Sequence, residues 1–109
     1  MDEVDRTQRE LSGGKPVTPE HREINPLTDQ QKGYIVLTVG ERAKGFVRPV
    51  RRTYIHKVCN TETRMSQDIA ETYARDPGFY NGTFCVQCRK HFPLDQFVWS
   101  DAPDEQVGS

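Results

Sequence analysis

The sequence is poor in cysteine, in long apolar runs and in charge of one sign, and each shortage excludes a class of protein. Its 109 residues include three cysteines, an odd number that would leave one thiol outside any set of disulfides. No apolar run approaches the roughly 20 residues needed to cross a membrane. The first five residues are acidic, where a secretory signal would be basic and then apolar. We therefore expect a soluble, cytoplasmic protein with no membrane partner.

Aromatic residues and cysteine are absent from residues 1–32, and every one of both kinds lies in residues 33–109. The first segment combines charge with proline and glycine, a composition that buries too little apolar surface to offset the entropy of ordering. We expect a flexible arm over 1–32, a folded domain over 33–100 and a flexible acidic tail over 101–109. A domain this small usually needs disulfides, a metal or a partner chain to be stable.

The cysteines fall in two short motifs separated by 25 residues: His56-Lys57-Val58-Cys59 and Cys85-Val86-Gln87-Cys88. A two-residue spacer lets one tight turn present two donors to the same ion, and zinc accepts thiolate and imidazole together. The spacing therefore predicts a zinc ion held by His56, Cys59, Cys85 and Cys88. The competing interpretation is that the cysteines are small buried apolar residues.

The histidine is the least secure of these four ligands. His91 follows Cys88 by the same two-residue spacing and is the alternative to His56. Four protein ligands fill a tetrahedron and leave no position for an activated water. We therefore expect structural zinc, no catalytic residue, no enzymatic activity and no small-molecule substrate. A site of three cysteines alone would be open and would restore an enzymatic interpretation.

The hydrophobic pattern predicts an α+β domain. Segments rich in β-branched and aromatic residues predict strands over 34–39, 46–50, 53–58, 83–85 and 96–99. Met65, Ile69 and Tyr73 recur every four residues, which indicates one amphipathic helix. We expect a small zinc-ribbon-like fold: a short antiparallel sheet, with the helix inserted between two zinc knuckles and most of the aromatic rings in the core.

Basic residues are concentrated in residues 41–60, which carry six basic side chains and one acidic side chain. Such a stripe can contact phosphates, or it can meet an acidic protein surface, or it can merely keep an edge strand soluble. A net charge of −1 and a pI of about 6.3 argue against avid, nonspecific coating of nucleic acid. The candidate residues for binding nucleic acid or a protein partner are Arg42, Lys44, Arg48, Arg51, Arg52 and Lys57.

The segment Cys85 to Phe97 resembles the CxxCxxxxPLxxF knuckle of small zinc-ribbon and zinc-knuckle proteins from bacterial and phage genomes. The resemblance implies a metal site and a bacterial cell or a phage-infected host, and it transfers no catalytic residue. Two functions remain open: a zinc-stabilised, non-catalytic module that associates with nucleic acid, and an adaptor or inhibitor that binds a larger protein. The sequence leaves the oligomeric state undetermined.

Overall fold

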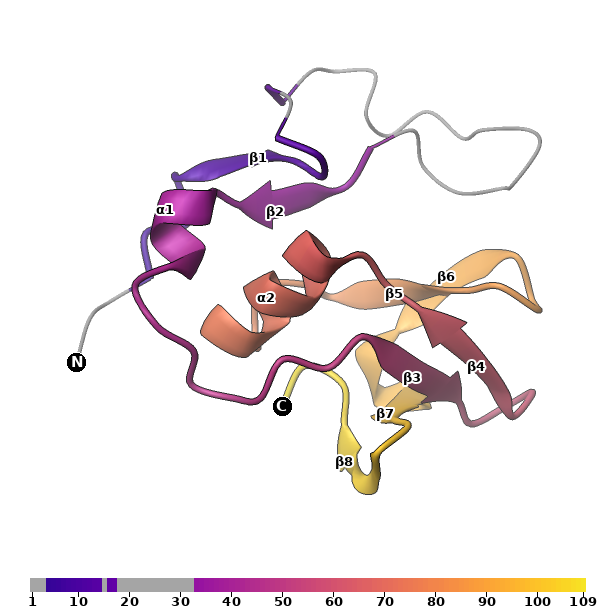
Figure 1. Ribbon diagram of the computed structural model, residues 1–109. Helices are drawn as coiled ribbons and strands as arrows, with labels where there is room; N and C mark the ends of the chain where they lie inside the picture. Colours follow the sequence, from indigo (N-terminus) through magenta and orange to yellow (C-terminus); the bar gives the residue numbers. More distant parts are fainter. Residues whose placement is uncertain (1–3, 15, 18–32) are drawn as a thin grey trace.

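The computed structural model describes residues 4–14, 16–17 and 33–109, and within them it is a mixed α+β protein (Figure 1). Every strand pairing is antiparallel. None of the helices in these ranges is long and apolar enough to cross a membrane. The elements are, in chain order, β1 (Arg9–Leu11), β2 (Ile35–Leu37), α1 (Val39–Arg42), β3 (Thr53–His56), β4 (Thr61–Arg64), α2 (Gln67–Arg75), β5 (Gly82–Cys85), β6 (Lys90–Pro93), the 3-10 helix η2 (Leu94–Gln96), β7 (Phe97–Trp99) and β8 (Ala102–Gln106).

The strands form one four-stranded sheet, of order β4-β3-β7-β8, and two ribbons, β1-β2 and β5-β6. In Figure 1, α2 lies between the β1-β2 ribbon and the remaining strands. The expected helix between the two ligand motifs is confirmed at Gln67–Arg75, and its apolar stripe faces the core, with Ala70 and Tyr73 buried. Phe97 and Trp99 of β7 are also buried. A domain this small needs such rings to fill its interior.

The ordered part of the molecule begins earlier than residue 33. β1 pairs with β2 in the register Arg9↔Leu37 to Leu11↔Ile35, and Leu11 is buried. The sequence predicts that the domain starts at residue 33, but residues 9–11 of the expected arm form a strand of the folded structure. The physical reason is that β2 is a short apolar strand whose backbone groups need a partner. Residues 1–3, 15 and 18–32 of the expected arm lie outside the described residues.

The C-terminal segment also differs from the expected flexible tail. β8 pairs with β7, with an irregularity between Val98 and Trp99, and Val107 is fully buried. The backbone amide of Val107 donates to the carbonyl of Phe97 at 3.1 Å. The acidic composition of residues 101–109 gave no sign of this strand, because Val107 is the one residue of the segment that is buried.

The strand expected over 46–50 does not form. Gly45 has a φ of +133°, outside the range of a β-strand, and Pro49 has no amide to donate to a sheet. The amides of Val47 and Arg48 instead both donate to the carbonyl of Ala74, at 2.8 and 3.1 Å. The chain therefore passes beside the end of α2 as an irregular segment before entering β3.

Candidate metal centre

The two ligand motifs occupy the same place in two similar hairpins. His56 is the last residue of β3 and Cys85 is the last residue of β5. In the first hairpin His56 pairs with Thr61, and in the second Cys85 pairs with Lys90, so each first ligand faces the residue five positions later. Each motif therefore forms the loop between two antiparallel strands, and the folded chain brings the two loops together.

The backbone of the two loops also matches. The amide of Asn60 donates to the carbonyl of His56 at 2.6 Å, and the amide of Arg89 donates to the carbonyl of Cys85 at 2.7 Å. Asn60 and Arg89 are the only non-glycine residues in the described ranges with positive φ, at 60° and 58°. Each loop thus turns sharply immediately after its second ligand, which directs both donors of the motif to one side.

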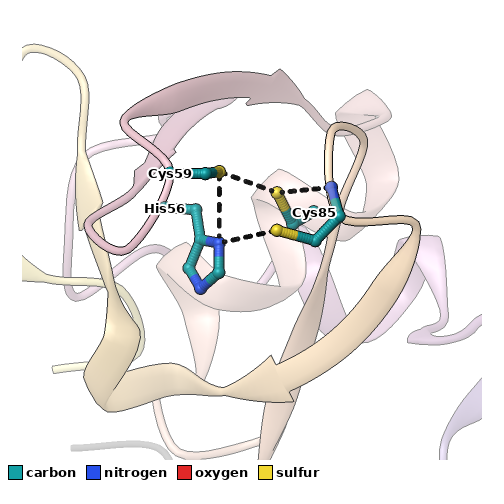
Figure 2. Close-up of side chains that lie close together, drawn as sticks. His56, Cys59 and Cys85 are labelled. Carbon is teal, nitrogen blue, oxygen red and sulfur yellow. Dashed lines mark hydrogen bonds between the residues drawn. The ribbon is translucent and has the colours of Figure 1, made fainter.

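The four donor atoms form a compact cluster (Figure 2). One ring nitrogen of His56 and the sulfurs of Cys59, Cys85 and Cys88 all lie within 4.8 Å of one another. The Cys59 and Cys85 sulfurs are 3.5 Å apart, and Nδ1 of His56 is 3.4 Å from the Cys59 sulfur and 3.6 Å from the Cys88 sulfur.

These separations match the edges of a metal-centred tetrahedron. Bond lengths of about 2.3 Å to sulfur and about 2.0–2.1 Å to nitrogen give edges of about 3.8 Å between sulfurs and about 3.6 Å between sulfur and nitrogen. None of the three cysteines is in a disulfide. The cluster could hold a metal ion, and its chemistry of three thiolates and one imidazole suits a borderline-soft, tetrahedral ion.

Gln96 fixes which nitrogen of His56 faces the cluster. The Gln96 carbonyl Oε1 lies 2.7 Å from Nε2 of His56, so Nε2 carries the proton and Nδ1 presents its lone pair to the three sulfurs. The backbone carbonyl of Gln96 also accepts a hydrogen bond from the amide of Lys57, at 2.9 Å. Sequence reasoning missed Gln96, since it lies 40 positions from His56 and no spacing rule connects them.

Packing holds the His56 ring in place. The side chain is fully buried, and its ring stacks on Phe97 with centroids 4.7 Å apart and lies 4.5 Å from the ring of Phe92. A buried imidazole that has one protein hydrogen-bond partner and an apolar stack on its faces has little freedom to turn. The ring is therefore preoriented for coordination through Nδ1.

The thiols differ in acidity. A hydrogen bond with the Thr61 side chain is the largest influence on Cys59 and lowers the pKa of its thiol to about 6. Burial is the largest influence on Cys88 and raises the pKa of that thiol to about 11. The amide of Cys88 also donates to the Cys85 sulfur at 3.4 Å. The Cys59 thiolate therefore forms readily, whereas a bound cation would favour the ionised form of Cys88 that coordination requires.

His91, the alternative fourth ligand, lies apart from this cluster. It pairs with Phe84 across the β5-β6 ribbon, and its Nε2 is 3.1 Å from the hydroxyl of Tyr34. Its ring also lies against the rings of Tyr34 and Phe84. Burial among these rings lowers the pKa of His91. The structure therefore brings His56, and not His91, to the three cysteines.

Several of the six candidate basic residues pair with acidic groups of the same chain. Arg42 is 2.7 Å from Glu71 and also donates to the carbonyl of Leu37. Lys44 is 2.8 Å from Glu41. Arg42 thus joins α1 to α2 and Lys44 pairs with a residue of α1 itself, so these two cations do not form an open basic face.

The other four candidates are spread around the sheet. Arg51 is 3.1 Å from Glu105 and lies over the ring of Trp99. Arg52 donates to a backbone carbonyl, that of Met65. Arg48 is exposed and donates to backbone carbonyls, and Lys57 is exposed in the first ligand loop. Arg48 and Lys57 are therefore the two candidates that are exposed and have no acidic partner within the described part of the chain.

No protein-family model, curated protein or solved structure matched this chain, so the resemblance to zinc-ribbon proteins rests on the residues of the knuckle and stays a prediction.

Proposed function

We propose that this protein is a small, non-catalytic binding module whose fold is stabilised by one zinc ion. The observation that carries the proposal is the cluster of four donor atoms within 4.8 Å, contributed by two hairpins that turn in the same way. Zinc favours this mixture of thiolate and imidazole in a tetrahedron. Because four protein donors complete the coordination, the ion would act as a structural crosslink between the two hairpins.

Metal analysis and chelation test this proposal. Binding of zinc to sites of this kind contributes about 10 to 16 kcal/mol, which is as large as the whole stability of a small domain. We expect one zinc per chain and loss of the near-UV circular dichroism signal when a strong chelator removes it. A Cys85→Ser variant should lose metal, whereas Cys88→Asp, which keeps an anionic donor, should retain weakened binding. A chain without zinc that keeps its near-UV signal would refute the proposal.

We assign the module to association with nucleic acid. The support is the pair of exposed lysines beside the two ligand loops: Lys57 lies in the first loop and Lys90 follows the second, and no acidic partner is present in the described ranges. Arg48 adds a third exposed cation. Three cations on a chain of net charge −1 fit weak, salt-dependent contact with phosphates better than tight coating.

Titration with a labelled single strand of DNA at 50 and 200 mM salt tests this assignment. We expect binding that weakens as salt rises, and further weakening by about tenfold in the double variant Arg48→Gln, Lys57→Gln. Arg9→Gln removes an exposed cation from β1 and serves as the control that should bind as the parent does. Binding that is absent at both salt concentrations would exclude the assignment.

A second function is favoured by one different observation. Val58 is 74% exposed in the first ligand loop and Val86 is 51% exposed in the second. Apolar side chains at the tips of two rigid loops are typical of contacts with another protein. If nucleic acid does not bind, the adaptor or inhibitor function becomes the better proposal, and substitution of both valines by serine should abolish capture of the partner protein.

A further inference from the structure

A cavity separate from the metal cluster lies between α2, β4 and the β5-β6 ribbon. Its volume is about 220 Å³, larger than the roughly 150 Å³ of an apolar cavity that accommodates benzene. It is partly open to solvent and could therefore be entered. Most of its wall is aromatic or aliphatic, and the side chains that form this part of the wall are Tyr34, Tyr54, Met65, Ile69, Tyr73, Tyr80 and Phe84.

Three of the four tyrosine hydroxyls in the wall, those of Tyr34, Tyr54 and Tyr80, have partners inside the protein. Tyr54 donates to the carbonyl of Phe84, and Tyr80 donates to the carbonyl of Ile35. Burial raises the pKa of Tyr54 to about 12, so this ring stays neutral at physiological pH. Because these hydroxyls are already hydrogen-bonded, an incoming group would contact the faces and edges of the rings. A flat ring is the shape that such a wall accommodates.

One charged residue is among those that line this cavity. Arg64 lines the cavity, yet it is exposed, and no acidic group or carbonyl in the described ranges pairs with it. Its neighbours on the strand, Thr63 and Met65, are buried and also line the wall. A guanidinium at the rim of an aromatic cavity is complementary to an anion attached to the ring that enters.

We propose that this cavity receives one base of a single-stranded nucleic acid, with the adjoining phosphate at Arg64. The inference rests on the proposed association with nucleic acid and names the part of the strand that is held. Stacking on aromatic rings tolerates every base, because each has a flat face, and the wall offers few unpaired groups to distinguish them. The site therefore holds a strand with little preference for its sequence.

The experiment compares two strands that carry the same charge. One is a 5′-phosphorylated strand of eight thymidine nucleotides, and the other has the same backbone without bases; both carry a 3′ fluorophore and are titrated into the full chain with its metal. We expect the strand with bases to bind about tenfold more tightly. Equal affinity for the two strands would overturn the cavity proposal while leaving contact with phosphates intact.

Two variants locate the effect. Ile69→Trp places a ring inside the cavity and should remove the preference for the strand with bases. Arg64→Gln changes an exposed residue and should weaken binding of the strand with bases more than Arg9→Gln does. Near-UV dichroism and metal content verify that each variant is folded. If Ile69→Trp does not fold, Arg64→Gln decides, and an effect equal to that of Arg9→Gln refutes the proposal.

Titration with free thymidine 5′-monophosphate tests whether the cavity takes its base from a free nucleotide or from a strand. We expect the nucleotide to shift the NMR resonances of the tyrosine rings and to bind more weakly than the strand does. Such shifts without any binding of the strand would keep the cavity as a nucleotide site and refute the association with nucleic acid. The absence of both would refute the two proposals together.

Discussion

At the scale of single residues, Gln96 contacts the candidate metal centre at two points. Its side chain accepts from the ring of His56, and its backbone carbonyl accepts from the amide of Lys57. The first contact sets the tautomer of the ligand and the second holds the loop that carries it. Partners of this kind commonly change metal affinity by 10- to 100-fold when they are removed.

We therefore predict that Gln96→Leu weakens zinc binding by about 10- to 100-fold, because Nε2 of His56 loses its acceptor. Gln96→Glu keeps an acceptor at this position and should bind metal at least as tightly as the parent. Competition with a chromophoric chelator measures both affinities. Gln87→Leu, an exposed change between the two cysteines of the second loop, is the matched control. Equal affinity in Gln96→Leu and Gln87→Leu would contradict the role given to Gln96.

Arg89 is strained by its backbone conformation. A φ of 58° costs a residue with a Cβ about 1–2 kcal/mol, and glycine avoids most of that cost. We predict that Arg89→Gly raises the free energy of unfolding of the metal-loaded protein by about 0.5–1 kcal/mol, as measured with denaturant. Arg89→Ala removes the same polar atoms but keeps the Cβ, and it should show no such gain.

At the scale of secondary-structure elements, α2 holds the N-terminal segment at both of its ends. At its start, Asp68 accepts one hydrogen bond from the hydroxyl of Ser12 and one from the backbone amide of Gly13, at 2.9 Å each. At its end, Asp76 pairs with Arg6 at 2.6 Å. The two carboxylates therefore fasten β1 along the helix and keep it beside β2.

The pH dependence of stability follows from Asp68. Burial alone would raise the pKa of this carboxyl, but hydrogen bonds from Ser66, Gly13 and Ser12 together lower it from the ordinary value of 3.8. A group whose pKa is lower in the folded state stabilises the fold above its unfolded pKa, and this stabilisation is lost as the pH falls through the folded pKa.

We therefore predict that Asp68→Asn lowers the free energy of unfolding by about 1 kcal/mol at pH 7, and that its difference from the parent narrows as the pH falls below about 3.8. Thermal unfolding between pH 7 and pH 3 measures this difference. Both proteins share the metal cluster, so release of metal by acid affects them alike. Asp104→Asn, an exposed change on β8, should not differ from the parent. A pH-independent difference between Asp68→Asn and the parent would contradict the assignment.

At the scale of the whole molecule, both ends of the described chain are attached to the core. The N-terminal segment is attached through β1, and the C-terminal segment contains Val107, whose side chain is fully buried in the same core cluster as Phe97 and Trp99. A chain this small has few apolar side chains to bury, so a single one from a polar terminal segment contributes noticeably.

We predict that Val107→Ala lowers the free energy of unfolding by about 2 kcal/mol, through the lost burial and the cavity left behind. Val86→Ala, a change at an exposed valine, is the matched control and should alter stability little. Denaturant unfolding of the metal-loaded proteins measures both. Equal stability of the two variants would show that the C-terminal segment does not contribute to the core.

Features that depend on local spacing follow from the sequence without a structure. Two donors three residues apart can be presented by one turn, and apolar residues four apart share one face of a helix, so the ligand motifs and α2 were visible without coordinates. Cys59, Cys85 and Cys88 have the proximity to one another that the predicted roles as zinc ligands require.

Features that depend on partners distant in the chain follow from the folded structure alone. Spacing favours His56 and leaves His91 as the alternative; pairing in the β5-β6 ribbon places His91 against Tyr34, while β3 carries His56 to the cysteines. The basic stripe predicted from the sequence includes Arg42 and Arg51, but in the folded chain both arginines contact acidic partners. Strand pairing and ion pairing join residues tens of positions apart, and a local sequence pattern does not predict which of these residues come into contact.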